Sequence, residues 1–265
     1  MALFFVAGGR SLEYELSLLM IVLLVTTGVV SGFINTLAGG GSMLTLPALM
    51  MLGMPADVAN ATKRVGVLMQ SVTGMKGFND HGRLDRGAII PVLVPTVLGA
   101  LVGSLMASFL PVWLLEPVLL VSMIGMALVM LIRPETVAPP EGTEPLSLTR
   151  SPMAAGGLFF AGVYGGFVQA GVGFILIAAL AGGLRYDLVR TNALKTVCTA
   201  VFSGVALIVF AWRGQVWWIP GAILAVGSIA GAMVSVRFAI NVSQNTLKWI
   251  LFVMVTATCT GAFLL

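Results

Sequence analysis

The chain of 265 residues carries 14 Lys and Arg and 10 Asp and Glu, so charged residues make up 9% of it, against about 25% in soluble domains. Hydrophobic residues make up 58%, and the mean hydropathy is +1.05. So few charges could not cover the surface of a soluble protein, and the same figures exclude disordered and collagen-like chains. A net charge of +4 does not indicate a nucleic-acid partner. The composition therefore predicts an all-α polytopic membrane protein.

Eight apolar stretches are long enough to cross a bilayer of about 30 Å as helices. Four precede a polar linker, at 16–38, 57–77, 88–110 and 112–132, and four follow it, at 153–170, 187–212, 217–239 and 246–265. Two further apolar pieces, 42–52 and 172–181, are too short to span, and each follows a glycine-rich break. Because lipid cannot satisfy the backbone at such a break, we expect both pieces to be buried in protein or to line a watery cavity.

The two halves of the chain repeat one sequence pattern. Asn60-Ala61-x-Lys63 falls on Asn192-Ala193-x-Lys195 at a shift of 132 residues, and Gly99 falls on Gly231 at the same shift. A repeated Asn-x-x-Lys is informative in a chain so poor in lysine. We predict a first transmembrane repeat at 1–132, a polar linker at 133–151 and a second repeat at 152–265, each with a glycine-broken short or re-entrant helix.

The placement of charges predicts that the two repeats are inverted. The loop at 76–87 carries Lys76, Arg83 and Arg86, whereas its counterpart near Gly214 carries only Arg213. The next pair of loops reverses the bias, because the turn at 109–116 has neither Lys nor Arg and its counterpart brings Arg237 and Lys248. By the positive-inside rule, equivalent loops then face opposite sides, which requires an odd number of crossings per half. The number is odd if the glycine-broken pieces complete one crossing jointly, or if the first span and the short piece of each half together form a hairpin. Both termini would then be extracytoplasmic.

Lys63 and Lys195 lie at membrane depth in equivalent segments. A charged side chain there is costly, and such residues usually face the bundle interior and serve a function. Asn60 and Asn192 each precede the lysine by three residues, which places amide and ammonium on one helix face. We interpret each face as the lining of a polar cavity. The alternative is a lysine that snorkels to the membrane interface.

Polar residues beside the glycine breaks are candidates for the same site. Asn35 and Gln169 stand at equivalent positions and would either satisfy broken backbone or contact a solute. The glycine run before Ser42 would either present N–H groups to an anion or form a tight turn. The predicted substrate-binding residues are Asn35, Gly40, Gly41, Ser42, Asn60, Lys63, Gln70, Gln169, Asn192, Lys195 and Thr199.

The remaining candidates have simpler interpretations. Asp57 and Asp187 stand at helix starts, where we expect capping rather than proton coupling. Cys198 is interpreted as a small hydrophobic residue, with a sulfur-handling thiol as the alternative. The lone His81 lies in a polar loop and does not indicate a metal site. We expect neither a cofactor nor an enzymatic activity, because no catalytic motif is present in the sequence.

Taken in order, these motifs resemble the signature of the sulfite exporter TauE/SafE family over essentially the whole chain. The first half contributes Gly32-Phe33-Ile34-Asn35, Ala38-Gly39-Gly40-Gly41-Ser42, Leu46-Pro47 and Ala59-Asn60-Ala61-Thr62-Lys63. The second half contributes Gly165-Gly166-Phe167-Val168-Gln169-Ala170-Gly171-Val172-Gly173 and Thr191-Asn192-Ala193-Leu194-Lys195. The resemblance implies a carrier in the bacterial inner membrane for sulfur-containing anions such as sulfite, thiosulfate or organosulfonates.

The sequence thus predicts a secondary transporter, by the resemblance an exporter, that works by alternating access of its two repeats around a midplane anion site. Lys63 and Lys195 would supply charge there, and Asn60 and Asn192 would hydrogen-bond the anionic oxygens. The partners are then a small anionic solute and the lipid bilayer, and a homodimer is one of the oligomeric states left open. Two alternatives stand: a carrier of another small anion such as a carboxylate, and a membrane sulfur-relay component that uses Cys198.

Overall fold

The computed structural model describes residues 2–7, 10–15, 17–132 and 143–243, together with residues 139 and 246. An antiparallel pair of strands that the sequence did not lead us to expect, β1 (Ala2–Ala7) and β2 (Arg10–Glu15), precedes the helices. The helices are α1 (Leu18–Leu37), α2 (Ser42–Met51), α3 (Ala56–Asp80), α4 (Ile89–Phe109), α5 (Val112–Ile132), α6 (Pro152–Phe167), α7 (Val172–Ile177), α8 (Leu188–Trp212) and α9 (Trp218–Asn241). Short 3₁₀ turns, η1 (Arg86–Ala88) and η2 (Leu148–Arg150), and a π-helical turn, η3 (Ala178–Gly183), complete the described elements.

The predicted helical membrane bundle is confirmed for the described residues, apart from the strand pair. Among the described residues, four segments are long and apolar enough to cross a membrane: α1, the continuous η1–α4, α8 and α9. Helix α3 has comparable length at 25 residues, but it buries polar and charged side chains along its course. The predicted span at 246–265 lies outside the described residues, except at Thr246.

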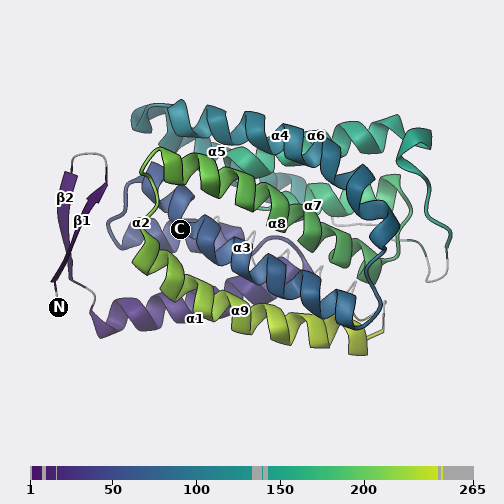
Figure 1. Ribbon diagram of the computed structural model, residues 1–265, viewed down its shortest axis with the longest axis horizontal. Helices are drawn as coiled ribbons and strands as arrows, with labels where there is room; N and C mark the ends of the chain where they lie inside the picture. The colour runs from purple at the N-terminus through teal and green to yellow at the C-terminus, as the bar shows by residue number, and fades with distance from the viewer. Residues whose placement is uncertain are drawn as a thin grey trace.

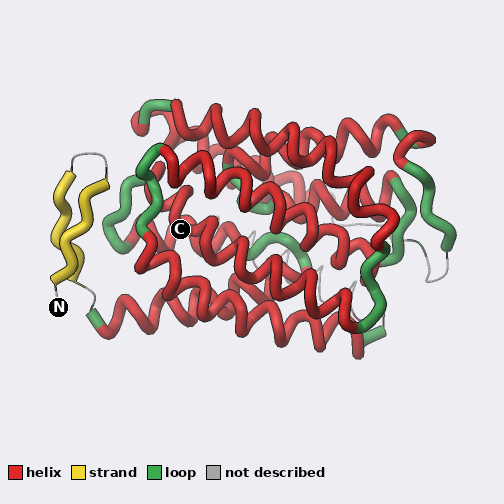
Figure 2. The backbone as a smooth tube through the Cα atoms, viewed as in Figure 1, coloured by secondary structure: helices red, strands yellow, loops and turns green. Residues whose placement is uncertain are grey.

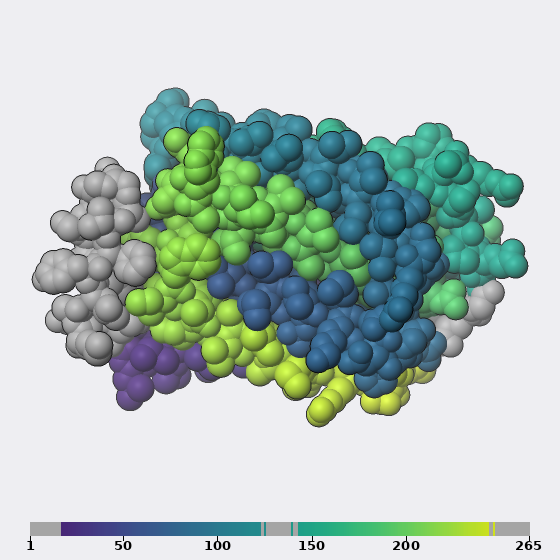
Figure 3. Space-filling model, in the orientation of Figure 1, coloured from purple at the N-terminus to yellow at the C-terminus, as the bar shows by residue number. Residues whose placement is uncertain are grey.

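The helices run roughly along the long axis of the molecule (Figure 1). Helices α4 and α6 form one layer and α1 and α9 another, and α3 and α8 pack side by side between them, where their side chains meet on the visible face (Figure 3). Loops gather at the two ends of this bundle, and the strand pair projects from the end where the chain starts (Figure 2).

Side-chain contacts define the two ends of the bundle. The first end comprises residues 52–55, 110–111 and 213–217. There the Arg213 guanidinium lies 4.5 Å from the centre of the Phe109 ring. At the second end, which comprises residues 81–88, 146–151 and 184–187, the Tyr186 hydroxyl donates to Asp85 Oδ2 at 3.1 Å. Helix α3 therefore runs from the first end to the second, and α8 runs in the opposite direction. Helix α4 returns to the first end, and α9 leaves it.

Two helix pairs, α1 with α9 and α4 with α6, pack at backbone distance. A Cβ atom at Gly28 would collide with the Leu224 carbonyl, and one at Gly162 would collide with the Thr96 carbonyl. Small residues spaced by four permit such an approach between membrane helices. All four helices carry the spacing, as Gly28 and Gly32, Gly99 and Gly103, Gly162 and Gly166, and Gly227 and Gly231.

The contacts of these glycines fix the register and direction of both pairs. Gly227 faces the Val25 carbonyl on α1, and Gly99 faces the Phe159 carbonyl on α6 in the same way. By these contacts, Gly99 of α4 corresponds to Gly227 of α9. Sequence matching instead pairs Gly99 with Gly231, which lies one helical turn further along α9. Both pairs are parallel, because a step of one turn along one helix moves the contact one turn forward along the other.

Both glycine breaks fall where the sequence predicts them, and both use left-handed backbone. Gly39 has φ +96° and Gly171 has φ +75°, conformations that glycine adopts without steric cost. After the first break the chain folds back, and Ser31 Oγ donates to the Gly41 carbonyl at 2.9 Å. After the second break, η3 returns to the start of α6, where Ser151 Oγ donates to the Gly183 carbonyl at 3.3 Å.

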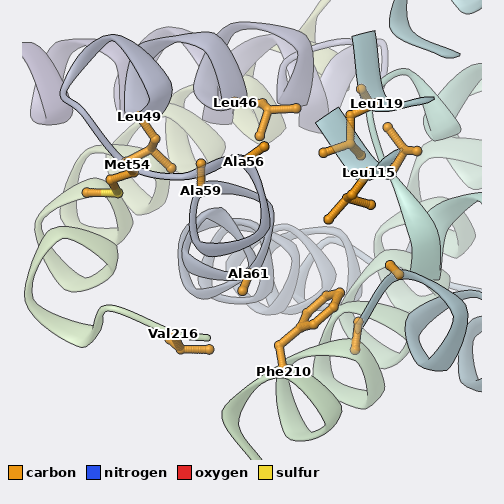
Figure 4. Close-up of a cluster of buried hydrophobic side chains, with 14 of the residues drawn as sticks. Leu46, Leu49, Met54, Ala56, Ala59, Ala61, Leu115, Leu119, Phe210 and Val216 are labelled. Carbon is orange, nitrogen blue, oxygen red and sulfur yellow. The ribbon is translucent and has the colours of Figure 1, made fainter. Parts of the chain in front are cut away.

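Buried apolar side chains secure the first half-helix against the rest of the bundle. Figure 4 shows Leu46 and Leu49 of α2 near Ala56 and Ala59 of α3, with Leu115 of α5 opposite them. The cluster extends to Phe210 of α8 and Leu224 of α9, so helices of both halves share it. Van der Waals contacts of this kind, which drive association of helices in a membrane, anchor α2 to the bundle.

Candidate functional site

Three cationic side chains are buried between the central helices. Lys63 and Arg64 on α3 are 0% exposed and Lys195 on α8 is 1% exposed. These lysines therefore do not snorkel to an interface, which excludes that alternative. Arg64 is not among the residues predicted from the sequence, although its position next to Lys63 doubles the charge at this depth.

Asn60 and Lys63 bind the carboxyl end of α6. Lys63 Nζ donates to the Val168 carbonyl at 2.8 Å, and Asn60 Nδ2 donates to the Phe167 carbonyl at 2.9 Å. The last carbonyls of a helix have no partner within the helix and carry its partial negative charge, so cationic donors are favourable there. These two residues of the first half thus cap a broken helix of the second half.

Arg64 completes this cap. Its Nη1 donates to the Gly165 carbonyl, and its Nη2 donates to the Gly166 carbonyl at 2.9 Å and to the Phe167 carbonyl at 3.3 Å. The guanidinium also lies 5.5 Å from the centre of the Phe210 ring, within range of a cation–π interaction. The four carbonyls from Gly165 to Val168 are therefore all bound by side chains of α3.

Lys195 and Asn192 occupy the corresponding place at the end of α1. Lys195 Nζ donates to the Thr36 carbonyl at 3.0 Å and to Asn192 Oδ1 at 2.7 Å. Asn192 is fully buried, and its Nδ2 has no hydrogen-bond partner among the described residues. The predicted Asn-x-x-Lys pairing on one face is thus observed in α8, where amide and ammonium touch directly.

The other predicted residues lie around the two breaks. Gln169 is fully buried with φ 69°, unusual for a residue other than glycine, and its Nε2 donates to Ser203 Oγ at 2.6 Å. Asn35 is 7% exposed, immediately before Thr36. Thr199 bonds only back to the Lys195 carbonyl among the described residues, at 2.8 Å.

Gly40, Gly41, Ser42 and Gln70 are all buried, and Ser42 Oγ and Gln70 Oε1 have no partner within the described chain.

The two aspartates behave differently from each other. Asp187 is the N-cap of α8, and its Oδ1 accepts from the Arg190 N–H at 2.9 Å, which confirms the predicted cap. Asp57 does not cap α3, contrary to our expectation, because Pro55 occupies the N-cap and Asp57 lies inside the first turn. Its Oδ2 accepts a long hydrogen bond of 3.5 Å from Gln215 instead.

Cys198 is buried, whereas His81 is exposed. Cys198 lies in an apolar cluster with Leu194 and Phe202, and the Thr96 hydroxyl donates to its Sγ at 3.9 Å. His81 is exposed at the second end, where Nδ1 contacts the Gly77 carbonyl at 2.8 Å. Within the described residues, no group of three His, Cys, Asp or Glu side chains is placed to hold a metal ion.

No carboxylate neutralises the buried cations in the described part of the chain. The ion pair found there joins Arg190 to Asp187 at 3.4 Å, close to the second end. A buried charge without a counter-charge is costly, and backbone carbonyls offset that cost only in part. The arrangement therefore holds an excess of positive charge in the middle of the bundle, where a small anion would be stabilised.

Comparison with known proteins matches residues 24–262 to the family described as "Sulfite exporter TauE/SafE". A "Probable membrane transporter protein" of Haemophilus influenzae is 25% identical over 89% of this chain and 91% of its own length. "Probable membrane transporter protein ORF9" of Sinorhizobium sp. is 24% identical over 91% of both chains. "Probable membrane transporter protein YfcA" of Escherichia coli K12 is 24% identical over 89% of this chain and 86% of its own.

Proposed function

Because the chain belongs to the sulfite exporter TauE/SafE family and is a multi-pass membrane transporter rather than an enzyme, we propose that it carries small sulfur-containing oxyanions across the bacterial inner membrane. Sulfite, thiosulfate and organosulfonates form the substrate class. The transporter exposes one buried anion site to each side of the membrane in turn, and export is the direction that the family name favours.

The observation that carries this proposal is the group of buried cations Lys63, Arg64 and Lys195, which lacks a carboxylate partner in the described residues. Charges inside a membrane protein mark solute pathways, and positive charge selects anions. The donors converge on the two glycine breaks, and broken helices are where transporters bind ionic substrates.

We further propose that the chain contains two inverted repeats. Helices α3 and α8, which carry the repeated Asn-x-x-Lys, run in opposite directions between the two ends of the bundle. The pair α1–α2 folds back toward the first end, and the pair α6–α7 with η3 folds back toward the second. These directions support a re-entrant hairpin in each half, the second of the two arrangements that the charge pattern allows.

The distribution of charge supports a cytoplasmic second end. The second end carries Arg83, Arg86, Arg150 and Arg185, whereas the first end carries Arg213 among its described residues. The positive-inside rule places the richer end in the cytoplasm. The start of α1 would then be extracytoplasmic, as the loop charges predict.

Two other functions are less well supported. A carboxylate carrier would use the same positive site, so only direct competition between solutes separates it from a sulfur-oxyanion carrier. A sulfur relay would need an accessible thiolate, and Cys198 is instead buried among apolar side chains. The Cys198→Ala variant should therefore retain transport.

Reconstituted protein tests the proposal directly. Proteoliposomes should accumulate labelled sulfite or an organosulfonate, and a tenfold excess of unlabelled dicarboxylate should compete poorly. The double variant Lys63→Met with Lys195→Met should lose this uptake, while Lys76→Met, outside the buried group, serves as a matched control. Uptake that survives in the double variant would refute the anion site.

A further inference from the structure

We infer that the two glycine breaks have different roles, and that the anion contacts Lys195, Asn192 and Thr36 at the end of α1 rather than Lys63 at the end of α6. This inference rests on the proposed function, since it assigns the contact within the proposed anion site. The repeated motif alone would give both halves equal roles. Three differences between the two breaks argue otherwise.

The first difference is the number of hydrogen bonds that tie each break to the neighbouring central helix. At the end of α6, three side chains bind four consecutive carbonyls, so Asn60, Lys63 and Arg64 act as a cap. At the end of α1, Lys195 is the side chain of α8 that binds a carbonyl of the break in the described structure. The α6 break is therefore tied to α3 by five hydrogen bonds and the α1 break to α8 by one in the described residues, so the α1 break is the freer of the two to bind a solute.

The second difference is the orientation of the two asparagines. Asn60 uses its NH₂ group on the Phe167 carbonyl, which leaves its Oδ1 without a partner in the described residues. Asn192 uses its Oδ1 on the Lys195 ammonium, which leaves its Nδ2 without one. The partners fix both orientations, because a carbonyl only accepts and an ammonium only donates. An anion is attracted by the free donor of Asn192 and repelled by the free acceptor of Asn60.

The third difference is the presence of buried hydroxyl groups. Thr36 and Ser42, which flank the first break, are 2% and 0% exposed, and neither hydroxyl has a hydrogen-bond partner among the described residues. Buried polar groups without partners are uncommon and call for an explanation such as a ligand. An oxyanion accepts several hydrogen bonds. The Lys195 ammonium, the Asn192 amide and the Thr36 hydroxyl are donors that could provide them.

The sequence explains why the two breaks differ. At the shift of 132 that aligns the lysines, Arg64 falls on Thr196. Arg64 provides the extra donors that saturate the α6 end, whereas Thr196 turns its hydroxyl back to the Ala193 carbonyl at 2.7 Å. The end of α1 thus lacks a counterpart of the Arg64 guanidinium, and Lys195 is the cation of α8 that binds it.

Paired asparagine variants test this assignment. Melting temperatures of the purified protein are measured against sulfite and organosulfonate concentration, for wild type, Asn192→Ala, Asn192→Asp and Asn60→Ala. We expect Asn192→Ala to raise the half-saturating concentration about tenfold, and Asn192→Asp to raise it further because its charge repels the anion. Asn60→Ala should lower the melting temperature without anion but keep the half-saturating concentration within twofold.

The outcomes separate this inference from the proposed function. If Asn60→Ala weakens anion binding as much as Asn192→Ala, or if Asn192→Ala leaves it unchanged, the assignment is wrong while the anion site stands. If wild-type protein responds to none of these anions in either binding or uptake, the proposed function fails and the assignment falls with it. Asn192→Asp preserves the size of the side chain and so guards against a variant that merely fails to fold.

An independent observation, the glycine packing, assigns the units that move. We propose that transport moves one body, α1–α2–α3 with α9, against a second body, α6–α7–α8 with α4. Helix α9 belongs to the second half of the sequence, yet it packs at backbone distance on α1 and also against α3. Likewise, helix α4 belongs to the first half of the sequence, yet it packs on α6 and α8 of the second half. The sequence halves are therefore not the moving units.

The interface between these bodies is formed mainly by α3 and α8, and the buried cations cross it. Lys63 on the first body binds the break of the second, and Lys195 on the second body binds the break of the first. Close packing of glycines along the length of two helices resists sliding, whereas the bodies meet through side-chain hydrogen bonds and the local backbone contact of Gly39 with Gly173. Movement along α3 and α8 would open the site without separating α1 from α9.

Engineered disulfides distinguish moving bodies from moving sequence halves, in a background with Cys198 and Cys259 replaced by Ala. A Cβ at Gly74 would lie 3.6 Å from Thr196 Cβ across the two bodies, and one at Gly77 would lie 3.3 Å from Val236 Cβ within the first body. Both distances are close to the about 3.5–4.5 Å of disulfides. Oxidation of Gly74→Cys with Thr196→Cys should stop transport, and reduction should restore it.

The second pair gives the decisive result. Oxidation of Gly77→Cys with Val236→Cys links the two sequence halves, so it should leave transport intact if the proposed bodies move and abolish it if the halves move. Gly157→Cys with Ala179→Cys, at 3.4 Å within α6 and η3, is the control that neither mechanism expects to matter. Loss of transport on oxidation of the Gly77 pair, with this control active, would overturn the proposal.

Discussion

The backbones of Gly39 and Gly173 lie in direct contact at the centre of the bundle, so that a Cβ atom on either would collide with the Cα of the other. The two residues are 134 positions apart, the same shift that relates Gly32-Phe33 to Gly166-Phe167. This contact brings the glycine break after α1 against the start of α7.

A methyl group at this contact should destabilise the protein strongly. Gly39→Ala must tolerate φ +96° and also displace the Gly173 backbone. Gly53→Ala has a similar φ of +83° but open space around its Cβ, so it reports the backbone strain alone. We expect Gly53→Ala to cost about 1 kcal/mol and Gly39→Ala at least about 2 kcal/mol more. Melting curves in detergent measure both, and equal costs would contradict the close contact.

Glycine packing between α4 and α6 gives a second prediction. Gly99→Ala should separate these helices, because its Cβ would collide with the Phe159 carbonyl and lie 2.8 Å from the Val163 nitrogen. The loss should be about 1–3 kcal/mol, the usual cost of overpacking. Gly156→Ala, on α6 with open space around its Cβ, should instead stabilise the helix by roughly 0.5–1 kcal/mol. Thermal unfolding compares the two, and a harmless Gly99→Ala would argue against the observed register.

The sequence predicted the helical bundle and both breaks because long apolar runs and glycine clusters are local signals. It also predicted Lys63 and Lys195, since a lysine at membrane depth stands out in a chain with few charges. The exchange of α4 and α9 between the bodies could not be read from sequence, because it depends on which distant helices pack together. Arg64 was missed because it is not part of the repeated motif: at the shift of 132 it falls on Thr196.

Backbone strain at Gln169 should be separable from its hydrogen bond. Gln169 has φ 69° and donates to Ser203, so Gln169→Ala loses the bond and keeps the strain, whereas Gln169→Gly loses the bond and relieves the strain. We expect the glycine variant to be about 1 kcal/mol more stable than the alanine variant. Arg185→Gly, at an exposed position with φ 64°, is the control that relieves strain alone and should not destabilise. An alanine variant as stable as the glycine variant would contradict the strain.

Alkaline pH should weaken the contact between Tyr186 and Asp85 at the second end of the bundle. Burial, with the neighbouring Asp85 carboxylate, raises the pKa of the Tyr186 hydroxyl above its usual value of about 10. The folded state therefore holds this proton more tightly than the unfolded chain does. The resulting stability is complete below about pH 10 and is lost as the pH rises beyond it.

Tyr186→Phe should remove this pH dependence. Its melting temperature should be lower than that of wild type at pH 8, because the hydrogen bond to Asp85 Oδ2 is lost, and should fall less between pH 9 and about pH 11. Asp85→Asn removes the negative charge while its side-chain oxygen still accepts the hydroxyl proton, so it should show an intermediate slope. Melting curves at half-unit steps of pH measure all three proteins. Parallel curves for wild type and Tyr186→Phe would show that the hydroxyl does not titrate in this range and that the contact contributes no pH-dependent stability.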